Sequence, residues 1–260
     1  MFVDLVGSTA LSARLDPEDM RDVIRGYQNA VAGEITRFEG NVAKFMGDGV
    51  LAYFGYPRAH EDEAERAVRA GLAITGAIGR LSNPSGEALS ARVGIATGLV
   101  VVGDLVGEGT AQEQAVIGDT PNLGARLQGV AAPGQVVISD ATRRLVGESF
   151  ELRALGDRRL KGLAKPVMAF AVTGERPVES RFEAMSGPSL LPMVGRDQEL
   201  ALLLERWALA KSGEGQGVLL VGEAGIGKSR ISRALLDALA GEPHFRVRYQ
   251  CSPYHTDSAL

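Results

Sequence analysis

Apolar positions along residues 1–173 change repeatedly between a strand spacing and a helix spacing. A first helix is predicted over 16–38, because Asp16 can cap it, Pro17 suits its first turn and apolar residues recur along one face. The other helices predicted in this region cover about 61–81 and begin at Thr120. We expect these helices to bury one face on a sheet.

The strands are predicted from shorter apolar runs. Residues 41–54 contain two such runs on either side of Gly47-Asp48-Gly49, which predicts a β-hairpin with Asp48 at its tip. The other predicted strands cover 89–96, 99–105, 135–138, 150–155 and 167–172, and one more ends at Gly118. Hairpins mixed with helical crossovers predict an α/β sandwich, with helices packed on one sheet.

A change of composition divides the chain. Periodicity is lost over 174–192, where Pro, Gly, Ser and charged residues gather, so we predict a linker between domains 1–173 and 193–260. The second domain is predicted to contain a helix near 197–211, a strand over 217–221 and a helix that ends near Ala240.

Composition and charge exclude several classes of protein. Lys and Arg number 28 and Asp and Glu 32, a net charge of −4, so no positive field favours nucleic acid or an acidic membrane. No apolar run approaches the roughly 20 residues of a membrane span. The single Cys251 cannot form an internal disulfide, and the first residues lack the pattern of a signal peptide. We therefore expect a soluble cytoplasmic chain with no nucleic-acid and no membrane partner.

Four short stretches combine glycine, acidic and basic residues in a fixed order. They are Phe2–Thr9 (FVDLVGST), Lys44–Gly49 (KFMGDG), Ala91–Gly98 (ARVGIATG) and Val116–Arg126 (VIGDTPNLGAR). Together they resemble the class III nucleotidyl cyclase domain, the catalytic domain of adenylate and guanylate cyclases. The resemblance covers nearly all of 1–173 and implies that family's ferredoxin-like α+β sandwich. It also implies attack of a ribose 3′-hydroxyl on the α-phosphate of its own triphosphate, with loss of pyrophosphate.

Two carboxylates are candidate metal ligands. Asp4 at a strand end and Asp48 at a hairpin tip can present hard oxygen ligands together. The resemblance places two Mg²⁺ or Mn²⁺ ions per active site at the matching positions. Taken singly, Asp4 as a helix cap and Asp48 as a turn former are the more ordinary roles, and only the other motifs favour the metal role.

Other candidates come from the predicted helix after Thr120 and from nearby strands. Asn122 and Arg126 are four residues apart, so they share one helix face. The resemblance implies that Asn122 orients the ribose and that Arg126 stabilises charge on the transferring phosphate, whereas an ordinary polar surface stripe is the alternative. Arg92 and Lys161 resemble positions that contact the triphosphate.

The choice of base depends on Lys44, which matches the purine-reading position of the family. Cyclases that use ATP usually have Lys there, and those that use GTP usually have Glu. Because Lys has only donors, guanine would be left with unmet donors of its own, so ATP is favoured as the substrate. Ala115 falls at the partner position, where the family often has Asp or Thr, so adenine selectivity is looser or a backbone carbonyl serves instead.

Family architecture assigns the metal carboxylates to one domain and the base-reading Lys and the Asn/Arg pair to another. A chain with one complete set is therefore expected to form a homodimer through the cyclase domain, with two symmetric sites.

Residues 222–229 (GEAGIGKS) match the P-loop pattern, and the nucleotide-binding residues expected there are Gly222, Gly225, Gly227, Lys228 and Ser229. Upstream, Val194–Glu199 resembles the N-terminal motif of signalling ATPases related to the AAA superfamily. A cyclase followed by such an ATPase resembles the soluble-type adenylyl cyclases and their bacterial relatives. Only 32 residues follow Lys228, and no later Asp ends an apolar strand, so we expect an incomplete P-loop unit that does not hydrolyse ATP. The few residues before Asp4 likewise suggest a piece of a longer protein, or a gene with a misplaced start and stop.

The leading hypothesis is an adenylate cyclase. The alternatives are a regulatory ATPase module that uses the cyclase fold as a nucleotide sensor or dimerisation domain, and a guanylate cyclase, which Lys44 disfavours.

Overall fold

The computed structural model describes residues 1–60, 62–104, 114–160, 166–176, 193–223 and 226–247. Contacts divide the chain into two compact units, Met1–Val178 and Glu179–Leu260, and each is described by itself. The strands of the first unit are β1 (Phe2–Leu5), β2 (Asn41–Met46), β3 (Gly49–Tyr53), β4 (Ala91–Ile95), β5 (Val101–Asp104), β6 (Gln114–Ile117), β7 (Val136–Ser139), β8 (Phe150–Arg158) and β9 (Val167–Glu175). Its helices are α1 (Ser8–Ser12), α2 (Pro17–Arg37), α3 (Glu63–Ile78), α4 (Asp119–Val130) and α5 (Asp140–Val146).

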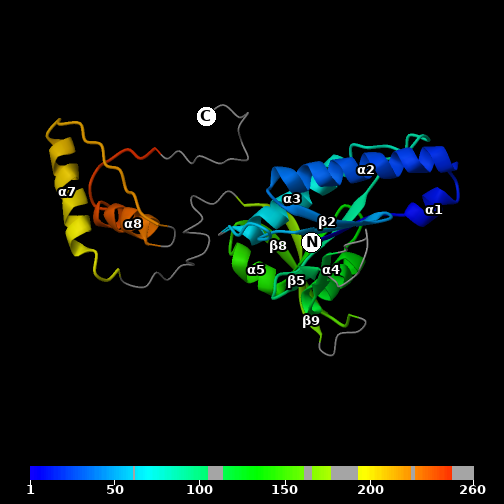
Figure 1. The fold of residues 1–260 in the computed structure, drawn as a ribbon. Coiled ribbons are helices and arrows are strands. Elements are labelled where there is room, and N and C mark those ends of the chain that lie inside the picture. Colours follow the sequence, from blue (N-terminus) through cyan, green and yellow to red (C-terminus); the bar gives the residue numbers. More distant parts are fainter. Residues whose placement is uncertain (61, 105–113, 161–165, 177–192, 224–225, 248–260) are drawn as a thin grey trace. The chain divides into compact units, whose positions relative to one another are not determined.

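A seven-stranded sheet in the order β2-β3-β1-β4-β7-β9-β8 forms the centre of this unit (Figure 1). All neighbouring strands are antiparallel except β4 and β7, which are parallel. Helix α3 packs on one face, where Gly71 lies against Val93 and Val136. Helix α4 packs on the other face, against Gly94 and Val137, the residues that directly follow Val93 and Val136 in the two strands. The sheet is therefore covered on both sides.

The contact between α4 and β4 is unusually close. A Cβ atom added at Gly94 would lie 2.2 Å from the backbone nitrogen of Gln128 and 2.3 Å from the backbone oxygen of Gly124. A Cβ added at Gly124 would in turn lie 3.0 Å from the ring of Phe2 on β1. Glycine at these positions lets the helix backbone lie directly on the two central strands.

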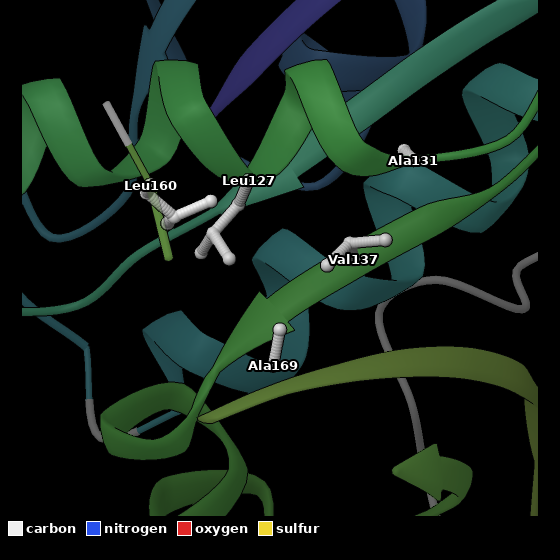
Figure 2. Close-up of a cluster of buried hydrophobic side chains, with 5 residues drawn as sticks. All are labelled: Leu127, Ala131, Val137, Leu160 and Ala169. Atoms are coloured by element: carbon white, nitrogen blue, oxygen red, sulfur yellow. The ribbon is translucent and has the colours of Figure 1, made fainter. Parts of the chain in front are cut away.

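Apolar side chains fill the space between α4 and the rest of the sheet. Figure 2 shows Leu127 of α4 and Ala131, just after the end of that helix, with Val137 of β7 and Ala169 of β9 beside them. Leu160 completes this cluster, and none of its five members is more than 7% exposed. The buried face of α4 is thus fixed on the sheet, which leaves its polar face for other contacts.

The prediction of one sheet was wrong in one part. Strands β5 and β6 pair with each other as a separate antiparallel ribbon, with Val101 opposite Ile117, so their backbone groups are satisfied without the main sheet. Helix α4 begins at Asp119, one residue before the predicted Thr120. Helices α1 and α5 were not predicted because five and seven residues are too few to show a helical period.

The second unit contains α7 (Asp197–Lys211) and α8 (Lys228–Ala238), close to the predicted ranges. The predicted strand 217–221 is not a strand in the structure. A strand needs a partner for its backbone groups, and no described strand pairs with this segment, where Leu219 is 85% and Val221 82% exposed. Among the described residues, none of the helices is both long and apolar enough to cross a membrane.

Candidate active site

Asp4 and Asp48 lie at the same edge of the seven-stranded sheet. Asp4 is on β1, in register with Gly49 of β3 on one side and with Arg92 of β4 on the other. Asp48 is in the turn between β2 and β3, and its backbone oxygen accepts a hydrogen bond from the backbone nitrogen of Leu5 at 3.4 Å. The hairpin tip is therefore held beside the end of β1.

Three helices contribute side chains that support this acidic pair. The Ser8 hydroxyl of α1 donates a hydrogen bond to Oδ2 of Asp48. On α2, Nε2 of Gln28 donates to the backbone oxygen of Gly47 at 2.9 Å, which holds the turn just before Asp48. On α4, Nε2 of Gln128 donates to Oδ2 of Asp4 at 3.2 Å. None of these three supporting side chains was identified from the sequence.

The electrostatics of the pair suit a cation. Burial raises the pKa of Asp4, and the negative charge of Asp48 raises it further, while Arg92 and the Gln128 hydrogen bond act in the opposite direction. The two carboxylates thus repel each other in a partly buried place, and a divalent cation between them would relieve that repulsion. The described residues include no group of three or more His, Cys, Asp or Glu that could hold a metal. Other ligands would have to be phosphate, backbone or water oxygens.

Tyr27, on the buried face of α2, is influenced by the acidic pair. Its side chain is fully buried, and its hydroxyl has no hydrogen-bond partner among the described residues. Burial raises the pKa of Tyr27, and the charges of Asp4 and Asp48 raise it further. The helical period predicts the burial of Tyr27 but contains no signal that the charges of Asp4 and Asp48 act on its hydroxyl.

We expect Tyr27→Phe to preserve the free energy of unfolding or to raise it by up to about 1 kcal/mol, because it removes a buried hydroxyl that has no partner. Urea unfolding of the two proteins measures this, with Tyr56→Phe as a control at an exposed tyrosine. A loss of more than about 1 kcal/mol would instead show that the hydroxyl is hydrogen-bonded, for example through water.

The other predicted site residues lie on separate elements. Asn122 and Arg126 are both exposed on α4, on the side away from buried Gly124 and Leu127. No hydrogen bond or ion pair joins either of them to Asp4 or Asp48 in the described part of the chain.

Arg92 is half-buried opposite Asp4, and its Nε has no partner among the described residues. Lys44 is exposed on β2. Ala115 lies on β6, paired with Gly103, and Lys161 lies outside the described residues.

The P-loop segment forms only part of the predicted site. Gly227 is the N-cap of α8 with φ 99°, and Lys228 and Ser229 begin the helix as predicted. Nζ of Lys228 donates hydrogen bonds to the backbone oxygens of Gly222 and Glu223, each at 2.7 Å. Gly225 lies outside the described residues. Nucleotide binding by this segment remains a prediction.

Residues 1–174 match the family model of the adenylate and guanylate cyclase catalytic domain. This chain belongs to that family. The match confirms the resemblance of the four sequence stretches, and it identifies residues 1–174 as a nucleotidyl cyclase catalytic domain with a mixed α/β sheet. A second model, the AAA ATPase domain, matches residues 192–260.

Relatives and solved structures extend the comparison of this cyclase domain. An uncharacterized protein of Rhizobium meliloti is 35% identical over 96% of this chain, and adenylate cyclase 1 of the same organism is 29% identical over 67%. This chain spans 24% and 27% of the length of these two proteins.

Two crystal structures have the same fold as this domain. That of the adenylyl cyclase CyaB from P. aeruginosa is 29% identical, with a TM-score of 0.62 over 68% of this chain and 93% of the other. That of the guanylyl cyclase Cya2 is 32% identical, with a TM-score of 0.62 over 68% and 91%.

Proposed function

We propose that this chain is an adenylate cyclase, which converts ATP into 3′,5′-cyclic AMP and pyrophosphate. The observation that supports this most directly is the pair formed by Asp4 and Asp48, two carboxylates held together at a sheet edge, where burial and the charge of Asp48 raise the pKa of Asp4 despite the opposing effects of Arg92 and Gln128. Such a pair fits divalent cations that also bind phosphate oxygens.

Each candidate residue has a role in this proposal. Asp4 and Asp48 would hold two Mg²⁺ or Mn²⁺ ions, which when bound neutralise charge on the triphosphate. Arg92, with its partly buried guanidinium opposite Asp4, and Lys161 would contact the triphosphate. Asn122 would orient the ribose so that its 3′-oxygen is in line with the α-phosphate. Arg126 would donate hydrogen bonds to the oxygens on which negative charge increases during the transfer.

The acidic pair and the pair formed by Asn122 and Arg126 lie apart in one chain, and this separation supports a site shared by two copies. Asn122 and Arg126 are not bonded to the acidic pair of their own chain, and they point away from the sheet. Large apolar side chains are exposed near the candidate site elements, as expected of a surface that associates; they are Phe45 (44%), Met46 (42%), Leu99 (96%) and Val101 (67%). In a symmetric dimer, each copy would give its acidic pair to one site and its Asn/Arg pair to the other.

The ATP assignment rests on Lys44, and incubation of the purified chain with labelled ATP or GTP and Mn²⁺ tests it. We expect cyclic AMP as the main product. Lys44→Glu should lower kcat/KM for ATP at least about tenfold and raise it for GTP, because an acceptor replaces a donor at the base. Lys211→Glu, the same charge reversal in the second unit, should change neither. Unchanged preference in Lys44→Glu would refute the assignment of Lys44 to the base.

A guanylate cyclase is the second candidate, favoured by the likeness to the guanylyl cyclase Cya2 and by Ala115, which cannot accept a hydrogen bond through its side chain. Formation of cyclic GMP from GTP at a higher kcat/KM than formation of cyclic AMP from ATP, in the same assay, would establish it. The match to the AAA ATPase domain allows a further, regulatory role for the second unit.

A further inference from the structure

Gln128 lies two residues after Arg126 on α4, and it is half-buried on the side that faces the sheet. Its Nε2 donates to Oδ2 of Asp4 at 3.2 Å, and the other oxygen of Asp4 accepts no hydrogen bond from the described residues. Arg126, with the proposed phosphate contact, and Gln128, which holds a proposed metal ligand, therefore lie on the same turn of one helix but on different faces of it.

The backbone of α4 cannot easily move independently of this bond. Its closest contact with the sheet is at Gly94, where a Cβ would be 2.2 Å from the backbone nitrogen of Gln128 itself. Phe2, two residues before Asp4 on β1, contacts the same helix at Gly124. A shift of α4 at Gln128 therefore acts on β1 and β4 together, and so on the strand that contains Asp4.

We propose that Gln128 is a positioning residue that holds Asp4 in the orientation needed for the cation and couples it to the helix with Asn122 and Arg126. This inference rests on the proposed function, in which Asp4 and Arg126 of one chain serve different sites of a homodimer. The hydrogen bond from Gln128 to Asp4 then links the two active sites through the body of each chain.

The chemistry of the carboxamide suits this role. As a neutral donor, it orients one carboxylate oxygen without adding a positive charge that would compete with a cation. Residues that orient metal ligands in this way typically contribute roughly 10- to 100-fold to metal affinity. The adjacent Gly129 and Val130 are exposed and have no comparable contact in the described residues.

The first test is binding of Mn²⁺ alone to the metal-free protein, measured by calorimetry without nucleotide. Gln128→Met keeps the length of the side chain and removes the donor, so Mn²⁺ affinity should fall roughly tenfold. Gln198→Met, the same change at an exposed position of α7, should leave it unchanged. Equal Mn²⁺ affinity in the wild-type protein and in folded Gln128→Met would overturn the positioning role. If Gln128→Met does not fold, Gln128→Asn, which shortens the donor, provides the same comparison.

The second test separates positioning from coupling. A heterodimer of an Asp48→Ala chain and an Arg126→Ala chain has one intact site. The Arg126→Ala chain supplies the two acids of that site, and the Asp48→Ala chain supplies its Asn/Arg pair. Gln128→Met on the Arg126→Ala chain should raise the Mn²⁺ concentration needed for half-maximal rate. The same change on the Asp48→Ala chain should lower kcat at saturating Mn²⁺.

An unchanged kcat when Gln128→Met is on the Asp48→Ala chain would refute the coupling of Asp4 to the helix that contains Asn122 and Arg126. A heterodimer that is inactive before Gln128 is changed would instead refute the shared site, and calorimetry would still decide whether Gln128 positions Asp4.

Discussion

Replacement of Asp48 by Ala is expected to lower the cyclase rate at least about 100-fold while the chain remains folded. Loss of a carboxylate that holds divalent cations removes several kcal/mol of charge stabilisation from the transition state, and each 1.4 kcal/mol is about a factor of ten in rate. Asp4→Ala should have the same effect. Product formation from labelled ATP with saturating Mn²⁺ measures it, and Asp22→Ala, an exposed acid of α2, is the matched control. Activity within twofold of the wild-type in either variant would contradict the metal role.

Neutralisation of Asp4 should not destabilise the metal-free protein. The folded-state pKa of Asp4 is raised above its ordinary value of 3.8, so between these two values the folded state binds more protons than the unfolded state. Stability of the metal-free protein therefore falls as pH rises through the raised pKa and is regained on acidification. Asp4→Asn removes this dependence and should melt at an equal or higher temperature at pH 7. A lower melting temperature would show that ionised Asp4 stabilises the fold.

Two inactive variants are expected to restore activity when they are mixed. A heterodimer of Asp48→Ala and Arg126→Ala keeps one complete site, because the remaining acids come from one chain and the remaining Asn/Arg pair from the other. If subunits exchange at random, half of the dimers are mixed and each has one intact site of two, so the rate should reach about a quarter of the wild-type value.

A mixture of Asp4→Ala with Asp48→Ala is the matched control for this experiment. Both changes affect the acidic pair, so each site of that heterodimer lacks one carboxylate and no activity should return. Failure of Asp48→Ala and Arg126→Ala to restore activity, with subunit exchange shown by a labelled chain, would contradict the shared site.

Local patterns predicted the elements that hold the acidic pair. The cap at Asp16, the hairpin around Asp48 and the helix that follows Gly118 all depend on neighbours within a few residues, and the structure contains all three. The contacts that complete the site are between residues far apart in the chain. Gln128 and Asp4 are separated by 124 positions, and no period or spacing relates them.

The errors have a similar origin. An apolar run such as 217–221 indicates a strand only if another strand pairs with it, and its own sequence does not contain that partner. Strands β5 and β6 were predicted correctly as strands, but whether they join the main sheet or pair with each other is decided by tertiary packing.

Gly94 determines the thickness of the layer between α4 and the sheet. With any other residue at this position the helix would have to shift outward, because the atoms within 3 Å of the added Cβ belong to its backbone. Asn122, Arg126 and Gln128 would move with it, by similar amounts and in the same direction. The absence of a Cβ at Gly94 of β4 thus determines, in each copy of the proposed dimer, how far the side chains of α4 extend toward the other copy.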